Sequence, residues 1–140
     1  DCRRFLEMLA RRSPRVASVR SLARHFRVRP STFMSRFFRA GLPSPKRYLA
    51  ATRLIHAAAL LEVDRLSIAD VAYRLDYSSP QSFGRHVRAV AGMTAGEFRR
   101  RCTVAIAVAD YVTRLIVPFR AALRTFHPLD HWVAETGQGW

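Results

Sequence analysis

Residues 68–90 read IADVAYRLDYSSPQSFGRHVRAV. Apolar residues recur at helical spacing on both sides of Asp76-Tyr77-Ser78-Ser79, which is a segment of turn-forming residues. The pattern predicts a short helix at about 67–75, a turn, and a second helix at about 80–90 that begins at Pro80. A short helix, a tight turn and an amphipathic second helix together have the layout of a helix-turn-helix unit.

The same unit occurs a second time, about 50 residues earlier in the chain. The copies match at apolar positions of both helices, which are Leu22, Ala23, Phe26, Phe33 and Phe37 in the first copy and Val71, Ala72, Leu75, Phe83 and Val87 in the second. Two copies are too few for a solenoid, which needs several stacked repeats. Two small helical units on a cationic chain instead indicate a protein that contacts a polyanion at two places.

The rest of the chain is also predicted to be helical, so the fold class is all-α. Capping residues, prolines and glycines divide it into helices at about 3–12, 19–26, 30–40, 45–62 and 95–101. The first unit then covers about 3–43, a long linker helix covers about 45–62, and the second unit covers about 67–101. We interpret residues 1–101 as one domain and residues 102–140 as an apolar C-terminal extension.

The extension differs from the rest of the chain in charge and pattern. Its three arginines are balanced by three acidic residues, and apolar residues lie on all sides of a predicted helix at about 103–117. Pro118 bends or ends this helix, and a second piece follows at 119–126. The Val/Ala alternation at 104–109 leaves a strand as an alternative. A helix that is apolar all round should be buried, either against the domain or in a partner.

The formal net charge of +14 makes nucleic acid or an anionic membrane surface the leading partner class. No run of apolar residues reaches the length of a membrane span, so we expect no membrane partner. Between Met8 and Leu61 there is no acidic residue against twelve cations, of which only Lys46 is a lysine. Arginine binds phosphate and guanine edges bidentately. A GC-rich genome gives the same arginine bias, so the bias does not decide the function.

Other functional classes find little support in the sequence. Cys2 and Cys102 are isolated, as is usual in a reducing compartment, and the start, Asp1-Cys2-Arg3-Arg4, has no apolar signal-peptide region. The chain begins without Met, which leaves open that it is a piece of a longer protein. His127 and His131 are four residues apart, but Pro128 lies between them and no third ligand is near, so we predict no metal site. Without a nucleophile–base motif or a glycine-rich phosphate loop, we expect neither an enzyme nor a cofactor.

The two copies carry longer motifs that match a known family. In the second copy these are Ile68-Ala69-Asp70-Val71-Ala72, Asp76-Tyr77-Ser78-Ser79, Phe83-Gly84-Arg85 and Gly92-Met93-Thr94-Ala95-Gly96-Glu97-Phe98-Arg99. The first copy matches through Leu22-Ala23, Phe33, Phe37, Ser44-Pro45, Tyr48-Leu49 and Arg53-Leu54. Over about residues 3–101 the chain thus resembles the DNA-binding domain of the AraC/XylS-type bacterial transcription regulators.

The resemblance implies two helix-turn-helix subdomains joined by the long helix. A helix of about 18 residues spans about 27 Å, which can place two recognition helices in successive major grooves on one face of DNA. The chain also departs from the family pattern. The turn glycine is replaced by Arg27 in the first copy and Asp76 in the second, and Leu42 stands where a glycine is usual. In a left-handed conformation Asp is tolerable, whereas Arg costs roughly 1 kcal/mol.

On a helical wheel, the second helix of the second copy turns Gln81, Arg85 and Arg88 away from its apolar face. Arg85 matches the family's recognition arginine and can pair with guanine O6 and N7; the alternatives are a phosphate contact or a bond to Asp76. Gln81 either reads adenine or is solvated. Pro80 and Ser82 border the groove, where they contact a thymine methyl group or a phosphate.

The first copy has smaller residues at the corresponding positions. Ser31 and Ser35 face outward and are the candidate base-reading residues of this copy, but they are too short for long-range base contacts, and Ser35 replaces the recognition arginine. Phe38 touches a thymine methyl group or covers a neighbouring helix, and we favour the second interpretation. The candidate phosphate-binding residues, each of which is alternatively a solvated surface charge, are Arg36, Arg39, Lys46, Arg47 and Arg88.

These observations favour a sequence-specific transcription regulator, in which the second subdomain reads bases and the first anchors the DNA backbone. The expected partner is double-stranded DNA in the bacterial cytoplasm and nucleoid. RNA polymerase and a second copy of the chain, bound through residues 102–140, are further expected partners. The alternatives are a nonspecific nucleic-acid-binding protein and a protein-interaction module driven by the apolar extension.

Overall fold

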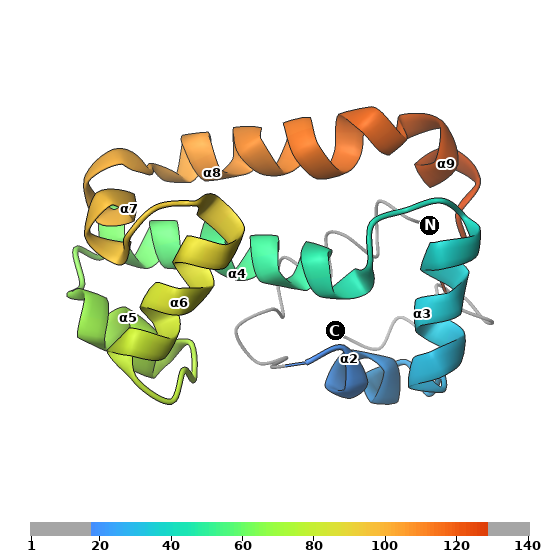
Figure 1. Ribbon diagram of the computed structural model, residues 1–140, viewed down its shortest axis with the longest axis horizontal. Helices are drawn as coiled ribbons and strands as arrows, with labels where there is room; N and C mark the ends of the chain where they lie inside the picture. The colour runs from blue at the N-terminus through green and yellow to red at the C-terminus, as the bar shows by residue number, and fades with distance from the viewer. Residues whose placement is uncertain (1–17, 129–140) are drawn as a thin grey trace, which may run out of the picture.

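The computed structural model describes residues 18–128, and every regular element in this range is a helix (Figure 1). The first helix-turn-helix unit contains α2 (Val19–His25) and α3 (Pro30–Arg39), and the linker helix is α4 (Pro45–Glu62). The second unit contains α5 (Ile68–Arg74), α6 (Pro80–Ala91) and α7 (Ala95–Arg101). The predicted all-α class is confirmed. The helix expected at about 3–12 lies outside the described residues.

The extension continues as a bent helical segment. It contains α8 (Val104–Tyr111), the π-helical turn η2 (Val112–Ile116), the 3-10 turn η3 (Val117–Phe119) and α9 (Arg120–Thr125). The strand considered for 104–109 is therefore wrong, because these residues belong to α8. The change from α to π to 3-10 geometry occurs next to Pro118, which has no N–H to donate within a helix.

Helix starts are set by side chains that cap the first turn. Most helices of the two units begin after a serine or threonine whose hydroxyl accepts a backbone N–H from the first turn; these residues are Ser18, Ser44, Ser67, Ser79 and Thr94. The exception is α3, which begins after Arg29 without a side-chain cap. Arg29 stands where the second copy has Ser79, so α3 and α6 start differently.

Both turns between the paired helices contain a left-handed residue. Arg27 has φ 57° and Asp76 has φ 60°, so both residues that replace the family's turn glycine are left-handed. The second helix of each unit is followed by a left-handed glycine, Gly41 with φ 72° or Gly92 with φ 70°. Leu42 is buried and has no left-handed backbone, because Gly41 provides the turn one residue earlier.

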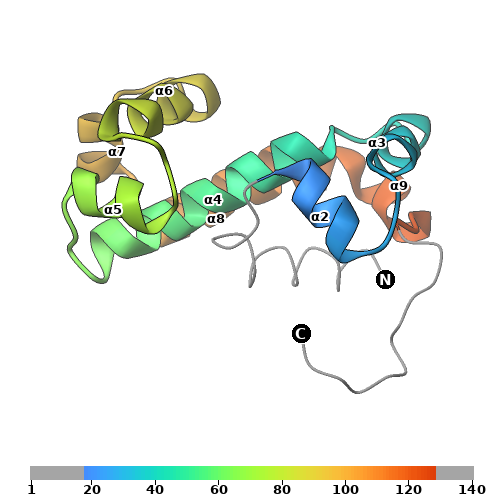
Figure 2. The ribbon, with the colours of Figure 1, turned by 90° about the horizontal axis from the view of Figure 1, so that it is seen from below.

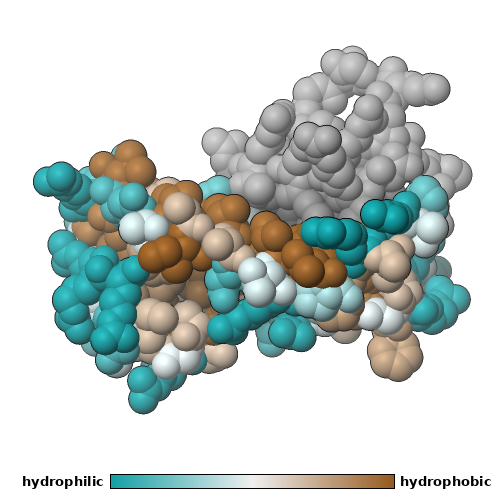
Figure 3. Space-filling model, turned by 90° about the horizontal axis from the view of Figure 1, so that it is seen from above, coloured by the Kyte–Doolittle hydropathy of each residue, from teal (hydrophilic) through white to brown (hydrophobic). Residues whose placement is uncertain are grey.

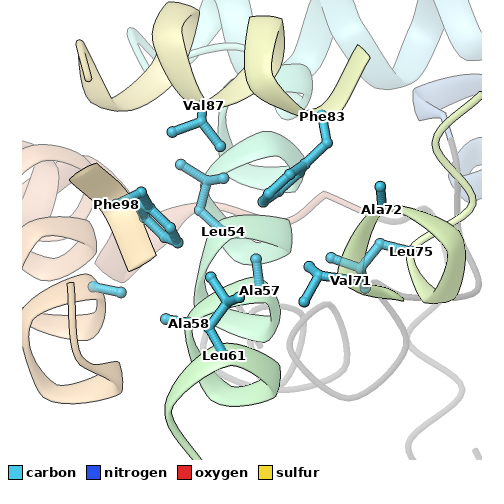
Figure 4. Packing of buried hydrophobic residues seen from close by; sticks show 11 residues of the cluster. Leu54, Ala57, Ala58, Leu61, Val71, Ala72, Leu75, Phe83, Val87 and Phe98 are labelled. Carbon is cyan, nitrogen blue, oxygen red and sulfur yellow. The ribbon is translucent and has the colours of Figure 1, made fainter. Parts of the chain in front are cut away.

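The two units have separate hydrophobic cores, and α4 contributes to both. Its first turns place Tyr48 and Leu49 in the first core, beside α2 and α3. Its later turns contribute to the second core, shown in Figure 4, where α5, α6 and α7 surround α4 with Val71, Phe83, Val87 and Phe98 packed around Leu54, Ala57, Ala58 and Leu61. The linker helix is thus part of each unit, and no flexible tether separates them.

Helix α8 lies along α4, on the side away from α2 and α5 (Figures 1 and 2). Only one face of the extension is buried: Ala107 joins the second core, whereas Leu115 and Phe126 join the first. The other face exposes Ile106, Val108, Val112 and Val117, and Figure 3 shows apolar residues gathered along it. The expectation of a fully buried helix is therefore met on one side only.

Within residues 18–128 no single helix is both long enough and apolar enough to span a membrane. Ala95–Arg101 and Val104–Thr125 reach the required length and apolar character only when taken together, as a pair bent by 105°.

Candidate nucleic-acid interface

The packing of α6 determines which of its side chains reach solvent. Phe83 and Val87 are fully buried against α4 and α5. Successive residues of a helix are 100° apart, so Gln81, Arg85 and Arg88 project from the opposite side, and all three are exposed. This outer face carries two guanidinium groups and one amide, which together offer bidentate hydrogen bonds to guanine and adenine edges.

Arg85 is free to contact a ligand. Among the described residues its side chain has no hydrogen-bond or ion-pair partner, so the bond to Asp76 that was considered as an alternative is not formed. Pro80, at the first position of α6, is exposed as well. Ser82 is half-buried, and its backbone N–H donates to Ser79 Oγ at 3.0 Å. Ser82 therefore exposes less of its side chain than Pro80, Gln81 and Arg85 do.

The outer face of α3 carries shorter polar side chains than the outer face of α6. Phe33 and Phe37 are buried in the first core, Ser31 is exposed and Ser35 is half-buried. Phe38 is 84% exposed, so it does not cover any helix in the described part of the chain and the favoured interpretation of this residue was wrong. The thymine-methyl contact remains a prediction for Phe38.

The candidate phosphate-binding residues differ in solvent exposure and in whether they form hydrogen bonds within the chain. Arg39, Lys46, Arg47 and Arg88 are exposed. Lys46 and Arg47 lie in the first turn of α4, where backbone N–H groups and the helix dipole add positive potential. Arg36 is half-buried and donates from Nη1 to the carbonyl oxygen of Pro128 at 3.0 Å, so part of its donor capacity is used within the chain.

Sequence reasoning assigned no role to Arg53, a buried cation of α4 that holds the second turn in place. Its Nη2 donates to the carbonyl oxygen of Leu75, the residue that ends α5, and its guanidinium carbon lies 4.4 Å from the centroid of the Tyr77 ring. The Tyr77 hydroxyl in turn forms a hydrogen bond with Nδ1 of His86 on α6. The sequence signal was a single arginine within the apolar stripe of the long helix.

Burial has opposite effects on the two titratable groups of this network. It raises the pKa of Tyr77, an increase that the Arg53 charge and hydrogen bond partly offset. It lowers the pKa of His86, and the positive charges of Arg53 and Lys46 lower it further. Desolvation disfavours the charged form of each group. At neutral pH α6 therefore carries a neutral imidazole on its inner side and arginines on its outer side.

A further basic cluster was not singled out from the sequence. Arg99, Arg100 and Arg101 form the last turn of α7 and are all exposed. Their position at a helix C-terminus stabilises the helix through its dipole. The three consecutive arginines in the sequence were the signal that could have indicated this cluster.

Two compact units, each presenting a polar helix from a strongly cationic chain, define a double helix-turn-helix protein of the nucleic-acid-binding class. Comparison with protein families gives the same result: a family described as "Helix-turn-helix domain", the AraC-type DNA-binding domain, matches residues 22–101. The chain belongs to this family and is a DNA-binding protein of the AraC-type transcription regulators, which are not enzymes. Such a regulator is located inside the cell. No curated protein and no solved structure matches the chain.

Proposed function

We propose that the chain binds two successive major-groove segments of one DNA site as a single unit, with α6 in one groove and α3 in the next. The observation that carries this proposal is the sharing of α4 by both cores. The 18 residues of α4 span about 27 Å, which suits recognition helices one helical turn of DNA apart. One monomer would then occupy a site that other helix-turn-helix proteins cover as dimers.

Within this arrangement the two units have different roles. Helix α6 supplies most of the sequence discrimination, since exposed Arg85 and Gln81 are long enough to reach base edges. Helix α3 mainly anchors the DNA backbone, because Ser31 and Ser35 are short, while Arg39, Lys46 and Arg47 are exposed nearby in the sequence. Its weaker base preference comes from the exposed Phe38, which can contact a thymine methyl group. Each good bidentate base contact contributes about 1–3 kcal/mol of discrimination, and a phosphate contact contributes to affinity for every sequence.

The experiment that tests these roles is a selection of bound sites from a random DNA pool. We expect Arg85→Ala to relax the preference at one or two adjacent base pairs, whereas Ser31→Ala and Ser35→Ala leave the selected sequence unchanged. Arg120→Ala removes an exposed arginine of α9 and serves as a charge-matched control. If Arg85→Ala kept the selected sequence and the serine variants lost it, the assignment of the two units would be wrong.

The same selection separates a regulator from a nonspecific coating protein. A specific regulator prefers its site over bulk DNA by roughly 10³-fold or more at physiological salt. A chain that enriched no sequence from the pool would instead be a nonspecific nucleic-acid-binding protein.

Two further partners follow from the extension and from the class of protein. A second copy of the chain is favoured by the exposed apolar face of α8, where the exposed ion pair of Arg114 Nε with Asp110 Oδ1, at 2.9 Å, can exchange partners across a twofold axis. Sedimentation velocity of Val112→Ser would show a lower oligomeric mass than the parent chain if this face self-associates; equal masses would count against it.

Contact with RNA polymerase remains a prediction without a particular surface.

A further inference from the structure

We infer that residues 104–128 form a brace that fixes the separation and angle of the two recognition helices, and thereby selects the spacing between the two half-sites in DNA. This inference rests on the proposed two-groove binding mode. The brace lies outside residues 22–101, the part of the chain that matches the family. Its residues are positioning residues, since they act through α3, α4 and α6 and not by touching DNA.

The brace begins by attachment to the second unit. The backbone N–H of Val104 donates to Glu62 Oε2 at 2.6 Å, so the first turn of α8 is tied to the last residue of α4. Ala107, one turn further on, is buried in the second core, where its small side chain allows α8 to approach α4 closely. Thr103 caps the start of α8 through its hydroxyl. These contacts fix one end of the brace on α4.

The other end of the brace is attached to the first unit, including its recognition helix. Leu115 and Phe126 are buried in the first core, and the Phe126 ring lies edge-on to Phe37 of α3 at 4.7 Å between centroids. The buried hydroxyl of Tyr48, on α4, donates to the carbonyl oxygen of Leu115 at 2.8 Å. Arg36, also on α3, donates to the carbonyl oxygen of Pro128.

The π-helical turn explains how one continuous segment reaches both cores. Ala107, Tyr111 and Leu115 are four residues apart, and such a stripe drifts around an α-helix by about 40° at each step. In η2 the Val117 N–H donates to the carbonyl of Val112, five residues back, so this turn takes up one residue more than an α turn. The extra residue offsets the drift, which returns Leu115 to the side that faces α4.

Two packed helices resist bending more than one. The two cores are separate clusters, and α4 and the brace are the elements that contribute buried residues to both. Without the brace, the angle between α3 and α6 would depend on the straightness of α4 alone, and long helices bend readily. With the brace, bending α4 requires α8 to slide along it and to break the Tyr48–Leu115 hydrogen bond. The brace therefore converts a linker helix into a rigid spacer.

A rigid spacer predicts narrow spacing selectivity. One additional base pair moves the second half-site by about 3.4 Å and rotates it by about 34° around the duplex. A rigid protein cannot follow this change without losing one set of groove contacts. A protein that bends at α4 can follow it at a small cost.

The test uses the full chain and a panel of DNA sites in which the two selected half-sites are separated by up to three base pairs more or fewer than in the best site. For the parent chain we expect affinity to fall about tenfold or more for a change of one base pair, which equals a single mismatch of 1.4 kcal/mol. For the double variant Leu115→Ala/Phe126→Ala we expect the affinity to fall by less than about threefold for the same change of one base pair. The base preference within each half-site should be unchanged. Ile106→Ala, on the exposed face of α8, is the matched control and should keep the narrow profile.

A milder variant covers the case in which the double variant fails to fold. Tyr48→Phe/Glu62→Gln removes or weakens two of the three polar attachments, those of α4 to the brace, while it keeps the apolar core, and it should broaden the spacing profile in the same direction. A profile as narrow as that of the parent chain in either folded variant would overturn the brace inference. A parent chain that selects no two-part site would instead overturn the proposed binding mode, so the two failures are distinguishable.

Discussion

Arg27 and Asp76 occupy the same position in the two helix-turn-helix turns and both have left-handed backbone conformations. This region costs most residues roughly 1–2 kcal/mol, whereas Asp can be accommodated through local hydrogen bonds. The first unit therefore contains a strained arginine where the second contains a tolerated aspartate. This difference in conformational cost arises from the backbone and not from side-chain packing, since the Arg27 side chain is exposed.

Replacement of Arg27 by glycine should stabilise the protein. We expect Arg27→Gly to raise the free energy of unfolding by about 1 kcal/mol, and Asp76→Gly to change it by less. Urea denaturation followed by circular dichroism measures both. Arg24→Gly, on the exposed side of α2, should lower the free energy by about 1 kcal/mol because glycine is unfavourable within a helix. Equal effects at positions 24 and 27 would show that backbone strain is not the cause.

His86 should make stability fall in mildly acidic solution. Its pKa is lowered in the folded state by burial and by the charges of Arg53 and Lys46, so the unfolded chain binds a proton more readily. Stability is then fully present above about pH 6.5, the unfolded pKa, and is lost as pH falls from there toward the lower folded pKa. His86→Gln should reduce this loss in urea titrations between pH 7 and pH 5. An unchanged pH dependence would mean that other groups cause it.

At the scale of the elements, the two recognition helices differ in their first turn. Ser79 caps α6, whereas α3 starts after Arg29 without a side-chain cap. We expect Ser79→Ala to lower the free energy of unfolding by about 1 kcal/mol and Arg29→Ser to raise it by a similar amount. Ser78→Ala, at an exposed serine next to the cap, is the control for serine removal. A loss at position 78 as large as at position 79 would contradict the capping argument.

Most helix bounds follow from local sequence signals, and the sequence predicted them closely. Ser44-Pro45 and Thr94 start helices through hydrogen bonds within one turn, and Gly92 ends α6 through its left-handed backbone. The extension was less predictable, because its residues are apolar on all sides and the buried stripe depends on contact with α4. The four-residue spacing of Ala107, Tyr111 and Leu115 was the signal, but only the π-helical turn makes it a straight contact line.

The candidate DNA-contacting residues were predictable where periodicity alone determines orientation, as for Gln81, Arg85 and Arg88. Long-range contacts could not be predicted in this way. Arg36 binds the carbonyl of Pro128, and Arg53 binds that of Leu75, because folding brings together segments that are far apart in the sequence. A helical wheel contains no information about such partners.

For the whole molecule, charge determines the salt dependence of DNA binding. Exposed arginines and lysine that neutralise phosphates release counterions, so the logarithm of affinity should fall linearly with the logarithm of salt concentration. Lys46→Ala should reduce the magnitude of this slope by about 0.9, whereas Arg120→Ala should leave it unchanged. Fluorescence anisotropy at several salt concentrations gives the slopes. A flat dependence in the parent chain would count against binding through phosphates.

The most direct test of the two-groove binding mode is methylation interference at guanine N7 on the selected site, with the protein at a concentration where it is monomeric. Binding by α6 and α3 in successive major grooves predicts two clusters of interfering guanines on one face of the duplex, with centres about 10 base pairs apart. Arg85→Ala should remove interference from one cluster only. A single cluster, or weak interference spread evenly along the site, would contradict binding of the two units as one.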